Sequence, residues 1–333
     1  MKRIFVCEFI TCGGLRDSEL TSPLFADAEL MYQALLADLR KIEYLEIITT
    51  RDDRLIPVSE SVANIENSDD PWQIWKNCME TADLAWIIAP ESDGILLKLN
   101  KMARASACEV IGCDDDAVTL TTSKYATNQY LNELGIPALE SKRLSDETIK
   151  SDKGWIVKRD DGAGSDDCHF FQNIEEYSLW EKQVDNKNKY IQQSYVEGIA
   201  ASMSVLYGIK ETVLLSCNKQ LVRIDSDKLF VEKIILNDLH AHQRQLQVLA
   251  NKIGNAIPGL RAYVGIDLIL TSAGPLVLEI NPRLTTSYVG LSGMLKKNLA
   301  EVILLSQHII NTDSYKRSPY TSQQRLDIDN VCA

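Results

Sequence analysis

A short stretch near the carboxyl end combines acidic and amide side chains with apolar neighbours. Two apolar runs within residues 265–283 are separated by residues 271–274, a spacing that predicts a β-hairpin. Folding the hairpin sets Asp267 opposite Glu279 to within one residue, and strand alternation puts Asn281 on the same face as Glu279. Like charges opposed across a ladder are destabilising, whereas carboxylate and amide oxygens are ligands that suit Mg²⁺ or Mn²⁺. The pattern predicts a metal site formed by Asp267, Glu279 and Asn281, and the alternative is a surface hairpin whose acids meet by chance.

A second candidate site follows a predicted buried strand over residues 155–158. This strand ends at Lys158 and precedes the glycine-rich run Gly162-Ala163-Gly164-Ser165. Such a loop can direct backbone N–H groups at phosphate oxygens, with the lysine as a point charge. The GxxxxGK[ST] spacing of a Walker loop is absent, so the alternative is an ordinary turn. Four aspartates around the loop would repel phosphate unless they point to water: Asp160, Asp161, Asp166 and Asp167.

Other polar side chains lie on or beside predicted elements. Lys124 lies on a predicted amphipathic helix over residues 116–135. Arg283 directly follows the predicted metal-site strand. We expect it to make a bidentate contact with a substrate carboxylate or phosphoryl group, and the alternative is an ordinary surface salt bridge. Three hydroxyl residues come next and either donate hydrogen bonds to a substrate or cap the last helix: Thr285, Thr286 and Ser287.

The elements that must position these residues begin with an alternation of strands and helices. Strands are expected over residues 3–9, 45–49, 84–89 and 109–112, and helices over residues 24–42, 71–81 and 93–106. This order predicts a parallel sheet with helices on both faces, whose ligands bind beyond the carboxyl ends of the strands. Gly13 and Gly14 follow the first strand there, as a substrate contact or as a tight turn. The GxGxxG spacing of a dinucleotide-binding fold is absent, which disfavours an oxidoreductase.

The rest of the chain has a different order. Further strands are expected over residues 155–158, 190–193, 203–209, 212–217, 229–236, 263–270 and 275–280, and helices over residues 116–135, 174–184, 239–253 and 288–310. The strands after residue 202 follow one another in a manner typical of antiparallel pairing, which predicts an α+β region after the α/β region. His240 and His242 open the helix over 239–253, where an exposed helix start is favoured over a metal pair.

Composition excludes several classes of protein. The chain has 35 Lys and Arg against 47 Asp and Glu, a net charge of −12, which disfavours binding to nucleic acid or an anionic membrane surface. Its apolar runs are far shorter than the roughly 20 residues that span a bilayer. The first nine residues predict a strand and not a signal peptide, and eight cysteines without a two-residue spacing are typical of reduced thiols. We therefore expect a cytoplasmic protein that acts on small molecules, and a homo-oligomer is compatible with the sequence.

The order of these motifs resembles the ATP-grasp superfamily of carboxylate–amine ligases. That order is Lys124, then Lys158 with its glycine loop, then a strand exit at Gln193, then the predicted metal residues. The resemblance implies an α/β domain over residues 1–115, followed by two α+β subdomains over 116–196 and 197–333 that enclose ATP. It differs from the common pattern at Gln193, where a glutamate is usual, and after Lys158, where a proline is usual.

The resemblance also implies a role for each motif. Lys124 and Lys158 would contact the phosphates of ATP, and Lys158 would act in catalysis together with Arg283. A loop over the γ-phosphate would consist of Gly162, Gly164 and Ser165. Adenine would meet Gln193, Ser194 and Val196. Two Mg²⁺ ions would be held by Asp267, Glu279 and Asn281.

Four segments resemble a narrower branch, the tyramine–glutamate ligases of methanofuran and methylofuran biosynthesis: residues 8–15, 88–95, 218–220 and 279–290. This resemblance implies that an amino acid and an amine are joined through an acyl phosphate, with glutamate as acyl donor and tyramine or tyrosine as amine. Asn218 and Gln220 share a strand face and would bind the amino-acid head, or else satisfy backbone groups in a turn. The other substrate contacts would be Gly13, Gly14, Arg283, Thr285, Thr286 and Ser287. The rival hypotheses are an ATP-grasp ligase for other amino-acid substrates and a non-catalytic nucleotide-binding protein.

Overall fold

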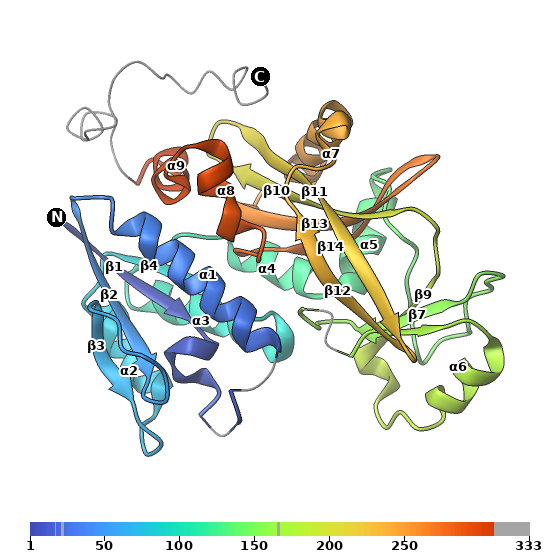
Figure 1. The fold of residues 1–333 in the computed structure, drawn as a ribbon, viewed down its shortest axis with the longest axis horizontal. Coiled ribbons are helices and arrows are strands. Elements are labelled where there is room, and N and C mark those ends of the chain that lie inside the picture. Colours follow the sequence, from blue (N-terminus) through green and yellow to red (C-terminus); the bar gives the residue numbers. More distant parts are fainter. Residues whose placement is uncertain (17, 21–22, 165–166, 310–333) are drawn as a thin grey trace.

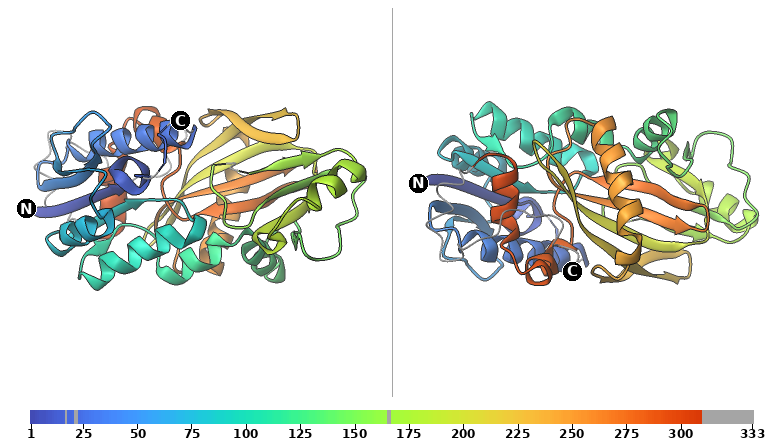
Figure 2. Two further views of the ribbon diagram at one scale, coloured as in Figure 1. Left: turned by 90° about the horizontal axis from the view of Figure 1, so that it is seen from below. Right: turned by 90° about the horizontal axis from the view of Figure 1, so that it is seen from above.

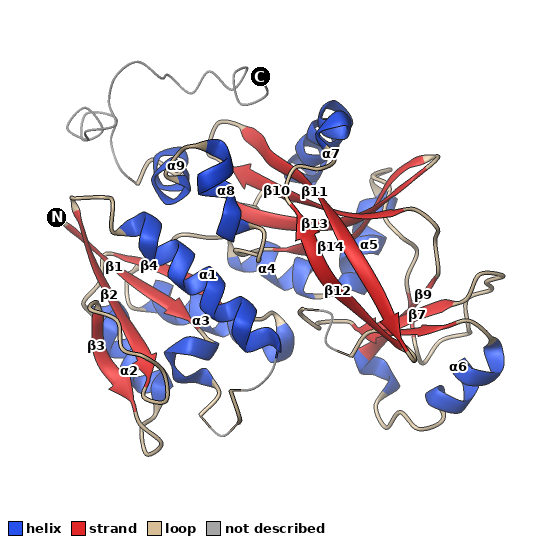
Figure 3. Ribbon diagram, in the orientation of Figure 1, coloured by secondary structure: helices blue, strands red, loops and turns tan. Residues whose placement is uncertain are grey.

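Two β-sheets form the framework of the described chain (Figure 1). The structure is a computed structural model, and it describes residues 1–309 except 17, 21, 22, 165 and 166. One sheet has five strands and comes from the first third of the sequence, and the other has nine strands and comes from the rest. Figure 3 shows both sheets with their flanking helices.

The five-stranded sheet is parallel and has the strand order β3-β2-β1-β4-β5. Its strands are β1 (Lys2–Glu8), β2 (Leu45–Asp52), β3 (Ser61–Ile65), β4 (Leu84–Ile88) and β5 (Glu109–Val110). The helices between them are α1 (Pro23–Leu39), α2 (Pro71–Glu80) and α3 (Ile95–Ala105). The sequence identified β1 and β4 because β4 is wholly buried and apolar and β1 has a buried apolar run from Ile4 to Cys7, whereas the partly exposed edge strand β3 was not predicted.

Short helical turns follow the carboxyl ends of β1 and β4. A π-helix, η1 (Ile10–Gly14), follows β1, and a 3₁₀ turn, η2 (Ser92–Gly94), follows β4. Gly13 has φ 97°, and a Cβ there would lie 2.8 Å from Ile65. Only glycine fits this position, since it tolerates positive φ and adds no Cβ. Glu8 accepts a hydrogen bond from the Thr11 N–H at 2.7 Å, and burial raises its pKa to about 8.

The nine-stranded sheet has the order β14-β13-β10-β11-β12-β8-β7-β9-β6, and its named strand pairs are antiparallel. One half consists of β6 (Lys142–Arg143), β7 (Trp155–Arg159), β8 (His169–Phe171) and β9 (Tyr190–Ser194). The other half consists of β10 (Ile199–Tyr207), β11 (Thr212–Asp225), β12 (Lys228–Ile235), β13 (Ala262–Thr271) and β14 (Gly274–Asn281). A single register pair, Lys228 with His169, joins the two halves.

Helices flank this sheet and connect it to the first. They are α4 (Asp115–Thr122), α5 (Lys124–Glu133), α6 (Ile174–Glu181), α7 (Gln243–Ala256), α8 (Tyr288–Leu295) and α9 (Leu299–Ser306), with 3₁₀ turns η3 (Lys187–Lys189) and η4 (His240–His242). The single helix predicted over 116–135 is wrong, because Ser123 is extended and its side chain caps α5 by accepting from the Ala126 N–H. The helix predicted over 288–310 is also two helices, since Lys296 adopts the left-handed conformation, and residue 310 lies outside the described residues.

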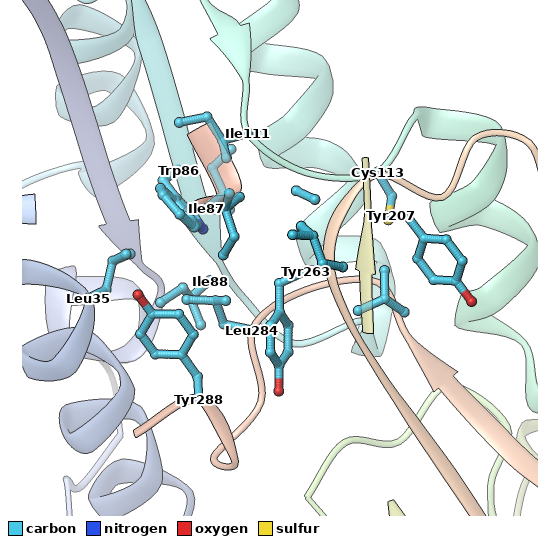
Figure 4. Close-up of a cluster of buried hydrophobic side chains, with 14 of the residues drawn as sticks. Leu35, Trp86, Ile87, Ile88, Ile111, Cys113, Tyr207, Tyr263, Leu284 and Tyr288 are labelled. Carbon is cyan, nitrogen blue, oxygen red and sulfur yellow. The ribbon is translucent and has the colours of Figure 1, made fainter. Parts of the chain in front are cut away.

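The two sheets share a buried core, part of which Figure 4 shows. Tyr263 of β13 and Tyr288 of α8 meet edge to face, with ring centroids 5.9 Å apart, and lie near Ile88 of β4. The Tyr288 hydroxyl donates to Asp38 of α1 at 3.0 Å. Figure 2 accordingly shows the C-terminal helices (red) beside the N-terminal sheet. The last helices therefore fix the second sheet against the first.

Two further expectations concern cysteines and membranes. The seven cysteines in the described residues are free and buried, which agrees with reduced thiols, and Cys332 lies outside those residues. Among the described helices, none is both long enough and apolar enough to cross a bilayer.

Candidate functional site

A cavity of about 240 Å³ lies between the two halves of the nine-stranded sheet. One wall comes from β7, β9 and the start of α5, and the other from β10 to β14. The cavity brings together nine of the residues singled out in the sequence: Lys124, Lys158, Gly162, Gln193, Ser194, Val196, Gln220, Asp267 and Glu279.

The hairpin predicted at one end of this cavity is confirmed. Asp267 of β13 pairs in register with Glu279 of β14. The Asn281 amide donates to Asp267 Oδ2 at 3.0 Å, and the Gln220 amide donates to Asp267 Oδ1 at 2.8 Å. Burial and the negative charge of Glu279 raise the pKa of Asp267. Two carboxylates and two amides therefore converge on one half-buried point.

Both lysines predicted for the site lie against Glu279. The Nζ atoms of Lys124 and Lys158 are each 3.5 Å from Glu279 Oε2. Burial alone would raise the pKa of Glu279, but the two ammonium groups outweigh it and lower that pKa. Lys124 also donates to the carbonyl oxygen of Gly162 at 2.5 Å, so it reaches the glycine loop as well. This cluster keeps Glu279 ionised and holds the two lysine ammonium groups beside the cavity.

Three of the four aspartates near the glycine loop are bound to protein partners, which weakens the objection that they would repel phosphate. Asp160 accepts hydrogen bonds from Ser123 Oγ at 2.7 Å and the Tyr125 N–H at 2.8 Å, and pairs with Arg143 at 2.6 Å. It thereby caps α5 and fixes the backbone that carries Lys124. Asp166 and Ser165 lie outside the described residues.

The other two aspartates are held at either end of the same loop. Asp161 pairs with Arg159 at 3.1 Å, and hydrogen bonds from its neighbours keep its pKa below the usual value although burial opposes this. Asp167 bonds to His169 Nε2 at 2.8 Å and accepts from the Tyr190 hydroxyl. Between them, Gly164 has φ +66°, which favours glycine, and it does not line the cavity.

The segment predicted to meet adenine lines the far end of the cavity. Gln193 is buried and donates to Ser141 Oγ at 2.8 Å, while the chain continues through Ser194 to Val196 along the wall. Apolar and aromatic residues that the sequence analysis did not single out complete this end: Leu139, Ile156, Tyr195, Val222, Leu229, Val231, Ile269 and Leu278. The alternation of apolar residues in β11 and β12 indicated that one face of each strand is apolar, but it does not reveal whether that face contacts a ligand.

Residues that follow the metal-site strand lie outside this cavity. Arg283 pairs with Glu91 at 2.8 Å, and its other nitrogen Nη1 donates to the Leu284 carbonyl. Burial lowers the pKa of Arg283, but Glu91 and more distant carboxylates outweigh it and raise the pKa overall. The Thr285 hydroxyl shares a hydrogen bond with Tyr263 at 3.0 Å.

The neighbouring hydroxyls also have protein partners. Thr286 donates to Asp27 of α1. Ser287 accepts from the amide of Asn218 at 3.3 Å. These residues tie the segment after β14 to α1 and to β11.

Three residues predicted to contact substrate are packed inside the protein. Asn218 has no exposed surface, and its amide bonds to Ser202, Ser204 and Ser287 while its oxygen accepts from the Asn237 N–H. The alternative interpretation, that this amide satisfies neighbouring groups, describes its contacts. Gly13 and Gly14 lie in the π-helix after β1, and a Cβ on Gly14 would overlap Phe9 at 2.5 Å.

No metal ion can be assigned from acidic, cysteine and histidine side chains alone. Within the described ranges, no group of three or more Asp, Glu, His or Cys residues is placed to hold an ion. His240 and His242 form a 3₁₀ turn ahead of α7, which agrees with the favoured interpretation of a helix start. Any oxygen-rich site at Asp267 and Glu279 would therefore need further oxygen ligands, of which the Asn281 amide oxygen is one candidate.

Comparison with known proteins places this geometry in a family. A family model described as an ATP-grasp domain matches residues 121–287, and one described as a pre ATP-grasp domain matches residues 45–118. The chain is 25% identical to tyramine–L-glutamate ligase of Methanocaldococcus jannaschii over 306 residues, which cover 90% of this chain and 88% of that protein. It is 28% identical to the ligase of the same name from Methanocaldococcus fervens, over 83% of this chain and 79% of that one.

The fold is similar to that of D-alanine–D-alanine ligase from Bacillus anthracis. The TM-score is 0.65 and the identity 12%, with 94% of this chain and 99% of that chain covered. The match over residues 121–287 contains the lysines, the glycine loop and the acidic hairpin described above. The chain therefore belongs to the ATP-grasp family and is an ATP-dependent ligase that forms a carbon–nitrogen bond.

Proposed function

We propose that this ligase joins the γ-carboxylate of L-glutamate to the amine of tyramine or tyrosine. The relatives that match most of its length are named as tyramine–L-glutamate ligases, which supports this choice of substrates. The observation that carries the chemistry is the cluster of Lys124, Lys158, Asp267 and Glu279 at one end of a cavity with an apolar far end. ATP fits this distribution, with adenine among the apolar residues and phosphates beside the lysines.

The donor set at Asp267 fits a divalent cation. Asp267 and Glu279 face each other across the strands, and burial together with the charge of Glu279 raises the pKa of Asp267, so a cation bound beside Asp267 would favour its ionised form. Their oxygens, together with the Asn281 amide oxygen after rotation of that side chain, are the hard ligands that Mg²⁺ or Mn²⁺ prefers. When bound, such an ion would neutralise charge on the transferring phosphoryl group. The three residues Asp267, Glu279 and Asn281 are therefore our proposed metal ligands.

The reaction that follows has two steps. A γ-carboxylate oxygen of glutamate attacks the γ-phosphorus of ATP, the bond to the bridging oxygen breaks, and ADP leaves. The amine nitrogen then attacks the acyl carbon, phosphate leaves, and the nitrogen gives up a proton. Lys158 stabilises charge on the transferring group, Lys124 and the loop from Gly162 to Ser165 hold the phosphates, and Arg283 orients substrate oxygens.

This assignment also defines a division of the chain. We take residues 116–196 and 197–333 as two subdomains that enclose the nucleotide, and residues 1–115 as a domain on the substrate side. Of the residues first expected to contact the amino acid, Gln220 lines the cavity, whereas Asn218 acts by supporting Ser287 from within. Thr285 and Thr286 would face the amine from the substrate side, and Gly13 with Gly14 would act only indirectly, through the packing of the π-helix after β1.

The test is formation of ADP and of a γ-linked amide. The purified protein with MgATP, L-glutamate and tyramine should release ADP, and mass spectrometry should find γ-glutamyltyramine. Omitting any component should stop product formation. Aspartate as acyl donor and Asp267→Asn as enzyme are the controls. Robust turnover with an unrelated acid, and no γ-linked product from glutamate with either amine, would show that the substrates are wrong while the ligase chemistry stands.

A further inference from the structure

The loop that follows β4, residues 90–93, contacts both chain segments that leave the nucleotide site. One contact is the ion pair of Glu91 with Arg283, which follows the metal-site strand β14. The other is with Asp161, which precedes the glycine loop. The roles proposed above for the site residues do not explain why a loop of the first sheet lies at this position.

The contact with Arg283 is buried and leaves the arginine incompletely bound. Glu91 is 4% exposed, and its Oε2 lies 2.8 Å from Arg283 Nη2. Arg283 Nε and Glu91 Oε1 are buried and have no hydrogen-bond partner within the described part of the chain. A guanidinium has five N–H donors in a fixed plane. A hydrogen bond from Nη2 to Glu91 therefore also fixes the direction of the remaining donors. Glu91 therefore aims Arg283 and leaves its Nε–H for another acceptor.

The contact with the glycine loop uses both side chain and backbone. Ser92 Oγ donates to the carbonyl oxygen of Asp161 at 2.9 Å, and the Asp93 N–H donates to Asp161 Oδ2 at 2.9 Å. Asp93 has φ 54°, a conformation that is unfavourable for a residue with a side chain. Backbone strain of this kind persists only where the surroundings enforce it, and here it presents the N–H to the loop.

We propose that residues 90–93 are a positioning element for the transfer steps. In this role, which rests on the proposed function, Glu91 is a positioning residue that acts through Arg283. Ser92 and Asp93 act through Asp161, and they hold the glycine loop in the position from which it would contact the phosphates. One four-residue loop thus sets the distance between the phosphoryl-transfer side of the site and the side that holds the substrate oxygens.

Kinetics of two variants test the proposal. Glu91→Gln keeps the shape of the side chain and loses its charge, and Ser92→Ala loses only one hydroxyl. Each should lower kcat by roughly 10- to 100-fold, the effect expected of a small displacement, with KM for ATP nearly unchanged. Glu91→Asp should recover part of the loss. Combined with Arg283→Lys, Glu91→Gln should cost little more than Arg283→Lys alone, because Glu91 acts through that residue.

A matched control separates positioning from stability. Glu29 pairs with the buried Arg51 at 2.8 Å within the first sheet region, so Glu29→Gln removes a similar charge from a similar pair. It should lower the melting temperature and leave kcat unchanged. An equal fall of kcat in Glu29→Gln, or a kcat in Glu91→Gln and Ser92→Ala that matches the wild type, would overturn the proposal.

A second measurement does not depend on the identity of the substrates. Amide hydrogen exchange over residues 159–164 should be faster in Ser92→Ala than in the wild type, because the loop loses an anchor. The kinetic variants are assayed by ADP release with whichever acid and amine the wild type accepts. Absence of turnover with glutamate and tyramine therefore counts against the proposed substrates alone. Unchanged exchange over 159–164 would count against the loop's anchoring role.

Discussion

The ammonium groups of Lys124 and Lys158 lie at the same distance, 3.5 Å, from one oxygen of Glu279. The two lysines come from different elements, since Lys124 begins α5 and Lys158 lies in β7. A single carboxylate oxygen thus connects α5, β7 and the strand β14. Removing either lysine leaves Glu279 with one partner, whereas removing Glu279 leaves the buried Lys124 and the half-buried Lys158 without their shared counter-charge.

The acidic pair should control metal-dependent turnover without holding the fold together. Asp267→Asn should lower ADP formation by roughly 10²-fold or more, because a ligand that orients the phosphoryl group is lost. The same change removes one of two facing negative charges, so the melting temperature of the metal-free protein should not fall. ADP release measured across a Mg²⁺ titration checks this, with Asp225→Asn in the exposed hairpin tip as the control. Full activity of Glu279→Gln at limiting Mg²⁺ would contradict the metal assignment.

The two lysines should differ in their kinetic effect. Lys158→Ala should lose roughly 10²–10³ in kcat, the usual effect of removing one preorganised charge at a reacting group. Lys124→Ala should chiefly weaken nucleotide binding, since Lys124 also contacts the Gly162 carbonyl and fixes the loop. Nucleotide affinity measured by calorimetry beside steady-state kinetics separates the two. Equal losses of affinity with unchanged kcat in both variants would refute this division.

The sequence was sufficient for elements whose pattern is local. The hairpin over 265–283 could be predicted because two apolar runs flank a short loop, and this placed Asp267 opposite Glu279 to within one residue, which the observed register confirms. The parallel order of the first sheet followed from alternating strands and helices. In the hairpin, residues close in sequence supply the determining contacts, whereas the first sheet was predictable from its regular alternation of elements although its paired strands lie far apart in the chain.

Other features depend on partners far away in the chain. Ser123 divides the predicted helix over 116–135 because Asp160, 37 residues later, binds its hydroxyl and caps α5. From the sequence, Asn218 could equally bind substrate or satisfy neighbouring groups of the protein. Its observed partners Ser204 and Ser287 belong to two other parts of the chain. Glu91 gave no indication of its partner, since Arg283 lies 192 residues away. Pattern and propensity carry no information about such tertiary pairs.

Glu8 should give the stability of the protein a distinct pH dependence. Its pKa in the folded state is about 8, against a usual value of 4.5, because the side chain is buried next to Cys12. The folded state therefore holds a proton that the unfolded state has lost, and stability falls as the pH rises from about 4.5 to 8, by up to about 1.4 kcal/mol per pH unit. Glu8→Gln lacks this proton, so its stability relative to wild type should improve between pH 5 and pH 8.

Denaturant unfolding at several pH values measures the effect. Glu60→Gln is the control, because the hydrogen bond from Arg40 lowers the pKa of Glu60 from 4.5 to about 2, so its contribution to stability changes only below about pH 4.5 and is constant above it. The stability difference of that variant should stay constant between pH 5 and pH 8. A constant difference for Glu8→Gln as well would show that Glu8 is ionised in the folded protein.

Gly265 should tolerate no side chain. A Cβ at this position would lie 2.4 Å from Thr285 Cγ2, so Gly265→Ala should destabilise the protein by about 1–3 kcal/mol through overpacking. Adding Thr285→Ser removes the methyl group in question and should recover part of the loss. Melting temperatures of the single and double variants check this, and Gly293→Ala, whose Cβ would meet nothing within 4 Å, is the matched control.

The seam between β8 and β12 has a mechanical consequence. Two backbone hydrogen bonds join the halves there, from Phe170 to Asp227 and from Leu229 to Cys168. Because so few backbone hydrogen bonds cross this seam, we expect the nine-stranded sheet to bend more easily there than within either half. Since the cavity takes Ile156 from one half and Ile269 from the other, bending separates its walls without unfolding either. A nucleotide that touched both walls, as proposed above, would stiffen the molecule in the direction in which this seam makes it most compliant.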